Sequence, residues 1–204
     1  MGFLKKLFSW LNSSVEGSVA LVGLGDSGKT TILHRINTNI FLEQTNVTMG
    51  LSVDTFEYNG VKFSAFDLGG QKTFQMVWEP YLRNALSVVY VVDASNPAFF
   101  QESAHVFKRT LEMMNPDAIL LFLINKMDLA EKSVLIDIQE IFELRDIRTI
   151  EKVKILNYFG VSAKTGDNFD KAFSWLSKAV KHTVKEEEKA YGTEQAMVLS
   201  RGIA

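Results

Sequence analysis

Eight consecutive residues near the start of the chain have the types and spacing of a phosphate-binding loop. The segment Gly23–Thr30 matches the pattern of glycine, any four residues, glycine, lysine, then serine or threonine. Its glycines would let backbone N–H groups turn toward phosphate oxygens, and the helix that follows would add the positive end of its dipole. Lys29 would neutralise the β- and γ-phosphates, and the Thr30 hydroxyl would ligate Mg²⁺. The loop therefore predicts a nucleoside triphosphate site.

A second group of residues predicts that the bound nucleoside triphosphate is hydrolysed. The run Asp67-Leu68-Gly69-Gly70-Gln71 follows an apolar strand pattern. Asp67 would hold the magnesium shell from the end of the strand, and the Gly70 N–H would meet the γ-phosphate. Gln71 would orient an attacking water, so we expect Gln71 and Lys29 to carry the catalysis.

Two further segments predict that the base is guanine. In Asn125-Lys126-Met127-Asp128, the Asp128 carboxylate can accept from both N1–H and N2–H₂ of guanine, a donor pair that adenine lacks. Asn125 would brace neighbouring loops, and the Lys126 stem would cover the purine face. Ser162-Ala163-Lys164 would offer the Ala163 N–H to guanine O6.

The elements that must position these residues alternate between short apolar runs and helical patterns. Asn59-Gly60 between two strand patterns predicts a tight hairpin, because both turn positions need positive φ. Strand–helix alternation with one hairpin predicts an α/β P-loop NTPase fold: a mostly parallel six-stranded sheet with one antiparallel edge strand and helices on both faces. The expected strands are Ser18–Val22, Leu51–Tyr58, Val61–Asp67, Ser87–Val92, Ala118–Ile124 and Val153–Val161. The expected helices are Thr31–Asn37, Phe99–Met114, Leu135–Glu143 and Phe169–Val184.

Two appendages flank this domain, which we place at residues 17–184. Residues 1–16 form an amphipathic N-terminal segment, and residues 185–204 form a polar tail that we expect to be a solvated helix end followed by disorder. Burying one Leu or Phe contributes roughly 1.5–3 kcal/mol, so the N-terminal helix could hold the protein on a membrane. Its apolar stripe consists of Phe3, Leu4, Leu7, Phe8 and Leu11.

Composition narrows the class of partner. The formal net charge of −2 argues against nucleic acid as the main partner. The chain has no cysteine, which removes thiolate chemistry and a prenyl anchor and permits a reducing compartment. The longest apolar run, Ala118–Ile124, is far too short to cross a bilayer. We expect a cytoplasmic protein that is peripheral to membranes in its GTP state.

From Gly17 to Val180 the sequence resembles the Arf/Arl/Sar branch of the Ras-like small GTPases, as a divergent member. The features that carry this resemblance are Asp-Leu-Gly-Gly-Gln followed by Trp78 and Tyr81, the amphipathic N-terminal segment and the missing C-terminal prenyl cysteine. The resemblance implies that Thr48 is a switch threonine that ligates Mg²⁺ only with GTP bound. It also implies that the hairpin slides on nucleotide exchange and expels the N-terminal helix toward the membrane.

The chain departs from the branch at several positions. Gly25 stands where Arf proteins usually have Asp, Val47 replaces a usual Pro, and Phe66 replaces a usual Trp. The expected metal ligands are Thr30, Thr48 and Asp67. The residues expected to bind the nucleotide are Gly25, Asp26, Ser27, Gly28, Lys29, Thr30, Thr31, Thr48, Gly70, Asn125, Lys126, Asp128, Ser162, Ala163 and Lys164.

These features predict a GTP-binding switch with slow, Mg²⁺-dependent hydrolysis of GTP to GDP, acting in membrane trafficking or signalling. Its expected partners are an exchange factor, a GTPase-activating protein, effector proteins and a membrane surface. An alternative is a GTP-dependent binding subunit with negligible hydrolysis, similar to the β subunit of the signal recognition particle receptor. An adenine-nucleotide kinase or ATPase is disfavoured by Asp128.

Overall fold

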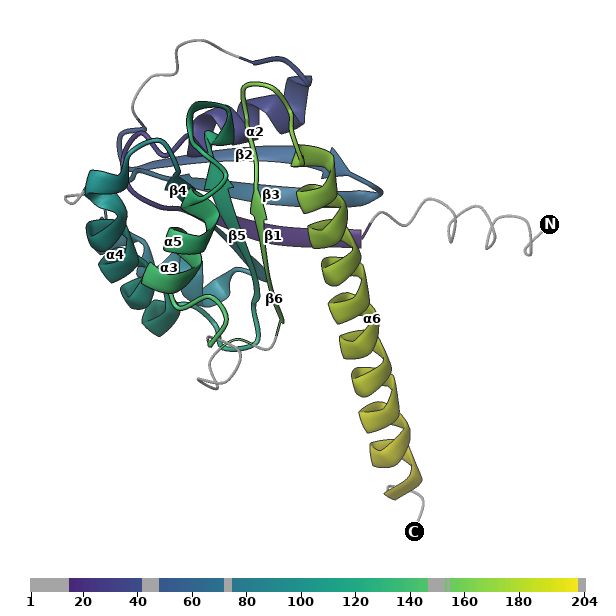
Figure 1. Ribbon diagram of the computed structural model, residues 1–204. Coiled ribbons are helices and arrows are strands. Elements are labelled where there is room, and N and C mark those ends of the chain that lie inside the picture. The colour runs from purple at the N-terminus through teal and green to yellow at the C-terminus, as the bar shows by residue number, and fades with distance from the viewer. Residues whose placement is uncertain (1–14, 42–47, 72–74, 147–152, 154, 202–204) are drawn as a thin grey trace.

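A six-stranded sheet forms the centre of the molecule (Figure 1). The computed structural model describes residues 15–41, 48–71, 75–146, 153 and 155–201, with side chains described as far as residue 191. The strands are β1 (Val15–Val22), β2 (Leu51–Tyr58), β3 (Val61–Leu68), β4 (Ser87–Asp93), β5 (Ile119–Asn125) and β6 (Ile155–Gly160). They lie in the order β2-β3-β1-β4-β5-β6, and only the β2–β3 pair is antiparallel. This confirms the predicted sheet and its antiparallel edge strand.

The central strands are apolar along their whole length because both faces of the sheet are covered by helices. Every residue of β5 is buried. One face packs against α3 (Glu79–Asn84), α4 (Phe100–Met113) and α5 (Val134–Ile141), and the other against α2 (Lys29–Thr38) and α6 (Phe169–Arg201). An aromatic cluster fills the first layer, consisting of Tyr90, Phe107, Phe122 and Phe142.

The hairpin between β2 and β3 turns where the sequence predicts. Asn59 and Gly60 have φ of 47° and 68°, the left-handed pair that a two-residue turn needs. The tip of the hairpin is tied to α6: the Tyr58 hydroxyl donates to Asp170, and Asn59 Nδ2 donates to the Ser174 hydroxyl at 2.9 Å. The Ser177 hydroxyl also donates to the Tyr58 carbonyl at 3.1 Å, so three side-chain bonds fix the hairpin tip on this helix.

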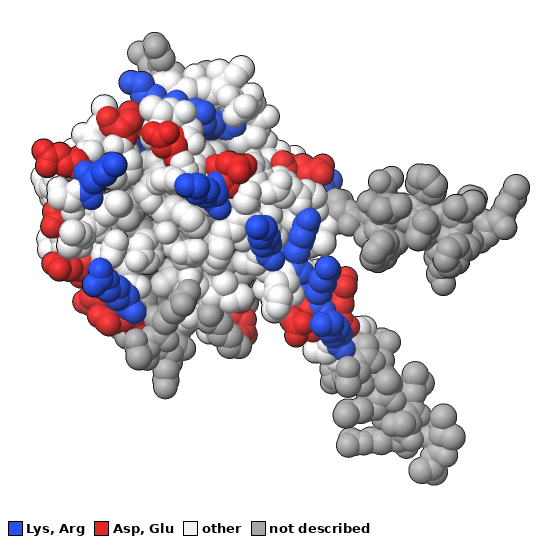
Figure 2. Space-filling model, turned by 45° about the vertical axis from the view of Figure 1, so that its right-hand side comes forward, with Lys and Arg blue, Asp and Glu red and all other residues white. Residues whose placement is uncertain are grey.

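The C-terminal helix differs from our expectation of a helix end near Lys185 followed by disorder. Helix α6 continues to Arg201 and projects well beyond the sheet (Figure 1). Acidic and basic side chains lie beside one another along its exposed part (Figure 2). Lys189 pairs with Glu186 at 2.9 Å, and this partner lowers the pKa of Glu186. Good helix formers and such pairs at helical spacing explain why the helix continues without a core to pack on.

Two other differences lie at the margins of the sheet. Strand β1 begins at Val15, so Val15 and Glu16 belong to the sheet, although we had assigned them to the N-terminal segment. Helix α3 was missed, because six residues that begin Glu-Pro give too short a pattern. The amphipathic stripe within residues 3–11 lies outside the described residues. Within the part of the chain that is described, no helix is long and apolar enough to cross a membrane.

Candidate functional site

The loop between β1 and α2 has a backbone that only glycine can supply at two positions. Gly23 has φ of 143°, and a Cβ there would lie 2.2 Å from the Val91 carbonyl oxygen. Gly28 has φ of 94° and caps α2, and a Cβ there would lie 2.4 Å from Asn125 Nδ2. The loop is therefore packed against β4 and β5 with its N–H groups at the start of a helix, which is the arrangement that binds phosphate.

Lys29 lies beneath this loop and is 5% exposed. Its ammonium group donates to the carbonyl oxygens of Gly23 at 3.1 Å and Leu24 at 2.8 Å. Burial lowers the pKa of Lys29 to about 8, against the opposing pull of the Asp67 and Asp26 carboxylates. Because the buried ammonium is poorly solvated, a bound phosphate would stabilise its charged form.

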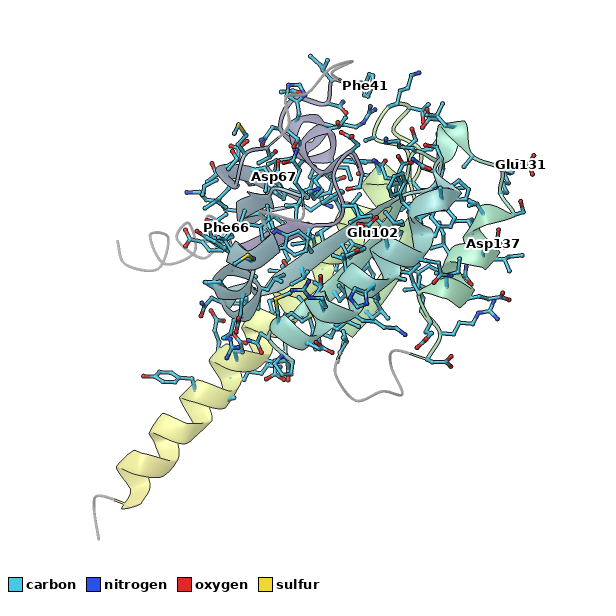
Figure 3. The ribbon with its side chains drawn as sticks, turned by 90° about the vertical axis from the view of Figure 1, so that its left-hand side faces the viewer. Phe41, Phe66, Asp67, Glu102, Glu131 and Asp137 are labelled. Atoms are coloured by element: carbon cyan, nitrogen blue, oxygen red, sulfur yellow. The ribbon has the colours of Figure 1, made fainter. Side chains whose placement is uncertain are left out.

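Three oxygen-bearing side chains from three separate segments meet at one point. The Thr30 hydroxyl donates to Asp67 Oδ2 at 2.6 Å, and the Thr48 hydroxyl donates to the same oxygen at 3.1 Å. The two hydroxyl oxygens are 3.0 Å apart. Figure 3 shows Asp67 between Phe41 and Phe66 in that view. The structure thus brings together all three residues that the sequence analysis expected to ligate a metal.

This cluster fits a magnesium ion. Asp67 is 1% exposed, and its Oδ1 is buried with no hydrogen-bond partner among the residues the structure describes. An uncompensated buried carboxylate oxygen beside two hydroxyls suits a hard cation that prefers oxygen ligands.

Gly70 lies directly against the phosphate loop. A Cβ on Gly70 would lie 2.4 Å from the Leu24 carbonyl carbon and 2.5 Å from the Gly25 nitrogen. Gln71 follows, exposed, at the rim of a hollow of about 350 Å³ between the loop and the start of α4. The hollow is lined by Leu24, Gly25, Asp26, Ser27, Gly70, Gln71, Val92, Asp93, Asn96, Phe99, Phe100 and Glu102.

The base-binding segments meet at the carboxyl end of β5. Asn125 joins two loops, because its Nδ2 donates to the Ser27 carbonyl at 2.9 Å and its Oδ1 accepts the Ala163 N–H at 3.0 Å. The Ser162 hydroxyl donates to Asp128 Oδ1 at 2.6 Å and so orients this exposed carboxylate. A guanine O6 would share the Ala163 N–H with Asn125.

Lys126 has a partner that the sequence analysis missed. It has φ of 64°, and its ammonium forms a 2.6 Å ion pair with Asp93 at the end of β4. Asp93 could have been found, because it ends an apolar strand at the same sheet edge as the other site residues. Of the remaining predicted nucleotide contacts, Thr31 lies on α2 and exposed Lys164 follows Ala163.

A phosphate loop with a magnesium-type oxygen cluster occurs in many ATP- and GTP-binding proteins. The oriented Asp128 beside a buried backbone N–H narrows the class to guanine-nucleotide binding, and with this sheet order the fold and site define a small GTPase.

The chain belongs to the ADP-ribosylation factor (Arf) family, whose family model matches residues 3–180. It is 32% identical to ADP-ribosylation factor 1 of Brassica rapa over 183 residues, which cover 89% of this chain and 98% of that protein. It is 33% identical over 177 residues to ADP-ribosylation factor-like protein 2 of Drosophila melanogaster, covering 86% of this chain and 94% of that one.

A solved structure shares the same fold. The Arl6 BBS3 small GTPase from Trypanosoma brucei, with the bound nucleotide analogue GppNp, superposes with a TM-score of 0.69 at 28% identity. The match covers 82% of this chain and 99% of that one. The predicted family resemblance is therefore confirmed, and the chain is a GTP-binding small GTPase of the Arf family.

Proposed function

We propose that this chain is a switch that reads the γ-phosphate of GTP and removes it slowly by hydrolysis. The observation that carries the proposal is the meeting of Thr48 with Thr30 and Asp67 at one oxygen cluster. Thr48 comes from the segment before β2, and Thr30 comes from the phosphate loop. A γ-phosphate and its metal ion would hold the two segments together, and loss of the γ-phosphate would release one of them.

Each residue of the site has a defined task in this proposal. Thr30, Thr48 and Asp67 would hold Mg²⁺, which supplies charge neutralisation to the phosphates when bound. Lys29 would exchange its two carbonyl partners for β- and γ-phosphate oxygens. The Gly70 N–H would donate to a γ-phosphate oxygen.

Gln71 would orient the attacking water from its place at the rim of the hollow. The water oxygen forms a bond to the γ-phosphorus as the bond from that phosphorus to the bridging oxygen breaks. The products are GDP and inorganic phosphate, and the proton of the water leaves with the phosphate. Because Gln71 is exposed, ordering it costs conformational entropy, so intrinsic turnover is slow. An activating protein that orders Gln71 would then raise the rate.

The test is single-turnover hydrolysis by Gln71→Leu. We expect unchanged GTP affinity and a rate constant lower by at least about tenfold, because misplacing a reacting group, here the attacking water, costs up to roughly 10²-fold. The matched control is Gln139→Leu, which makes the same change on α5, where Gln139 accepts from Arg145. Near-normal turnover by Gln71→Leu would refute the assigned role. A wild-type chain that hydrolyses nothing, even with cell extract, would favour the GTP-dependent binding subunit instead.

We further propose that residues 1–12 attach the GTP-bound protein to membranes. The support comes from the sequence, since five apolar side chains form one helical stripe opposite Lys5 and Lys6. Near anionic lipid each lysine adds about 1 kcal/mol.

Sedimentation with vesicles containing phosphatidylserine tests this attachment. With a GTP analogue bound, Phe3→Glu with Leu7→Glu should abolish binding. The control adds the same two charges to the polar face, as Ser9→Glu with Asn12→Glu, and should retain most of it. Equal binding by both double variants would eliminate the proposed membrane helix.

A further inference from the structure

One arginine outside every segment predicted to bind nucleotide supports the guanine-reading loop from behind. Arg35 lies in the second turn of α2, half-buried. Its Nη1 donates to the carbonyl oxygens of Ala163 and Lys164, each at 2.9 Å. The two carbonyls that directly follow the Ala163 N–H, the group that would be offered to guanine O6, are thus held by one guanidinium.

Two neighbours fix the guanidinium in this place. Its carbon lies 5.8 Å from the centroid of the Phe169 ring, within the range of a cation–π contact. Gly166 also lies against it, with φ of 92°, and a Cβ at Gly166 would lie 2.4 Å from Arg35 Nη2. A glycine is needed here both for the backbone conformation and for the space that the arginine fills.

We propose that Arg35 is a positioning residue for guanine recognition, which sets the backbone of residues 162–164 so that the Ala163 N–H reaches O6. The proposal rests on the guanine site described above. In this role Arg35 acts through the two carbonyls it holds and needs no contact of its own with the base or the phosphates. A planar guanidinium suits this task because its donors are fixed in one plane, whereas a lysine ammonium is a single point of charge.

Asn125 holds the Ala163 N–H itself, while Arg35 holds the carbonyl of the same residue. The Ala163 N–H donates to Asn125 Oδ1 at 3.0 Å, while the Ala163 carbonyl accepts from Arg35. The two contacts hold both ends of this short segment between α2 and β5. Without Arg35 the Ala163 N–H would keep its contact with Asn125 and the Ser162 hydroxyl its bond to Asp128, but the carbonyls of Ala163 and Lys164 would lose the guanidinium donor.

The experiment compares GDP with 6-thio-GDP, in which a weakly accepting sulfur replaces O6 while N1–H and N2–H₂ are kept. Dissociation constants of both are measured on the wild type, Arg35→Ala and Arg35→Lys. We expect the wild type to prefer GDP, and Arg35→Ala to lose most of that preference while releasing GDP roughly tenfold faster, as expected for the loss of charge-assisted hydrogen bonds. Arg35→Lys should lie between the two. The matched control is Arg145→Ala. Arg145 lies just beyond α5 and its guanidinium donates to Gln139, so its removal should leave the preference for GDP over 6-thio-GDP unchanged.

The ratio separates positioning from a general loss of structure. If Arg35 only stabilised the fold, Arg35→Ala would weaken the binding of both nucleotides by the same factor. The ratio of the two dissociation constants would then be unchanged, and that result would overturn the proposal. If the wild type itself bound both nucleotides equally, the Ala163 contact with O6 would be refuted, and the role of Arg35 with it. That outcome leaves the Gln71 hydrolysis test untouched, so the two proposals can fail separately.

Discussion

Gly70→Ala should separate the recognition of GTP from that of GDP. The added methyl carbon would lie 2.4, 2.5 and 2.6 Å from three backbone atoms of Leu24, Gly25 and Gly23. Ordinary contact begins at 3.4 Å, so the two segments must move apart by about 1 Å. Because all three neighbours are backbone atoms of the phosphate loop, no side chain can rotate to make room.

The size of the effect follows from this overlap. Overpacking typically costs about 1–3 kcal/mol, and the rigid surroundings of Gly70 favour the upper half of that range. The cost falls on the arrangement in which Gly70 lies on the loop, which is the one that would serve a γ-phosphate. A penalty of about 2 kcal/mol lowers the preference for the triphosphate roughly thirtyfold. Affinity for GDP should change little.

The assay is displacement of a fluorescent GDP analogue by GDP and by a non-hydrolysable GTP analogue. Gly17→Ala is the matched control, because a Cβ at Gly17, near the start of β1, meets only side-chain atoms, the nearest at 3.1 Å, and its ratio should stay within about twofold of the wild type. An unchanged ratio in Gly70→Ala would refute the reasoning. Equal weakening of both nucleotides would also count against it, since the damage would then lie in the loop itself.

Three other perturbations have defined outcomes. Asp128→Asn should lose GDP affinity by roughly a hundredfold and gain xanthine nucleotides, because the amide offers a donor where guanine needs an acceptor; competition with XDP measures this. Burial lowers the pKa of Lys29 to about 8, and phosphates raise it again in the complex, so binding takes up a proton above that pH. GDP affinity should therefore be flat below about pH 7 and fall by up to tenfold per pH unit above 8, and a flat profile to pH 9 would contradict this. Phe122→Ala, at a fully buried ring in contact with three others, should lower the free energy of unfolding by about 3–5 kcal/mol in urea titrations.

The sheet could be predicted from the sequence because its signals are local. Continuous apolar runs such as Ile119–Ile124 mark strands that are covered on both faces, and Asn59-Gly60 admits few conformations other than the turn observed. The site followed from the same pattern, since the carboxyl ends of parallel strands meet at one edge. The residues that were selected from separate short segments for their chemistry therefore lie close together in the structure, as expected.

What the sequence did not reveal depends on contacts between distant residues. Arg35 meets the carbonyl of Ala163 across 128 positions, and nothing in its own neighbourhood distinguishes it from an exposed helical arginine. Asp93 differs from Arg35, because its place at the end of an apolar strand could have marked it; only its pairing with Lys126, which has a positive φ, could not be read from the sequence. The length of α6 was misjudged for another reason: a polar composition fits both a solvated helix and a disordered tail.

Any change in the register of the hairpin against β1 would have to occur in even steps. Side chains alternate between the two faces of a strand, so moving β2–β3 by one residue along β1 would turn buried Phe56 and Phe63 outward, and Phe56 would lose its edge contact with Phe173 on α6. A step of two residues keeps every side chain on its own face and shifts the strand by about 7 Å. That distance exceeds the reach of all three bonds between the hairpin tip and α6, and it would also separate Asp67 and Thr48, which lie on and beside the hairpin, from Thr30 on α2. The pleat would therefore restrict a moving hairpin to discrete positions, and the oxygen cluster at one end of it and the three bonds to α6 at the other would be formed or lost together.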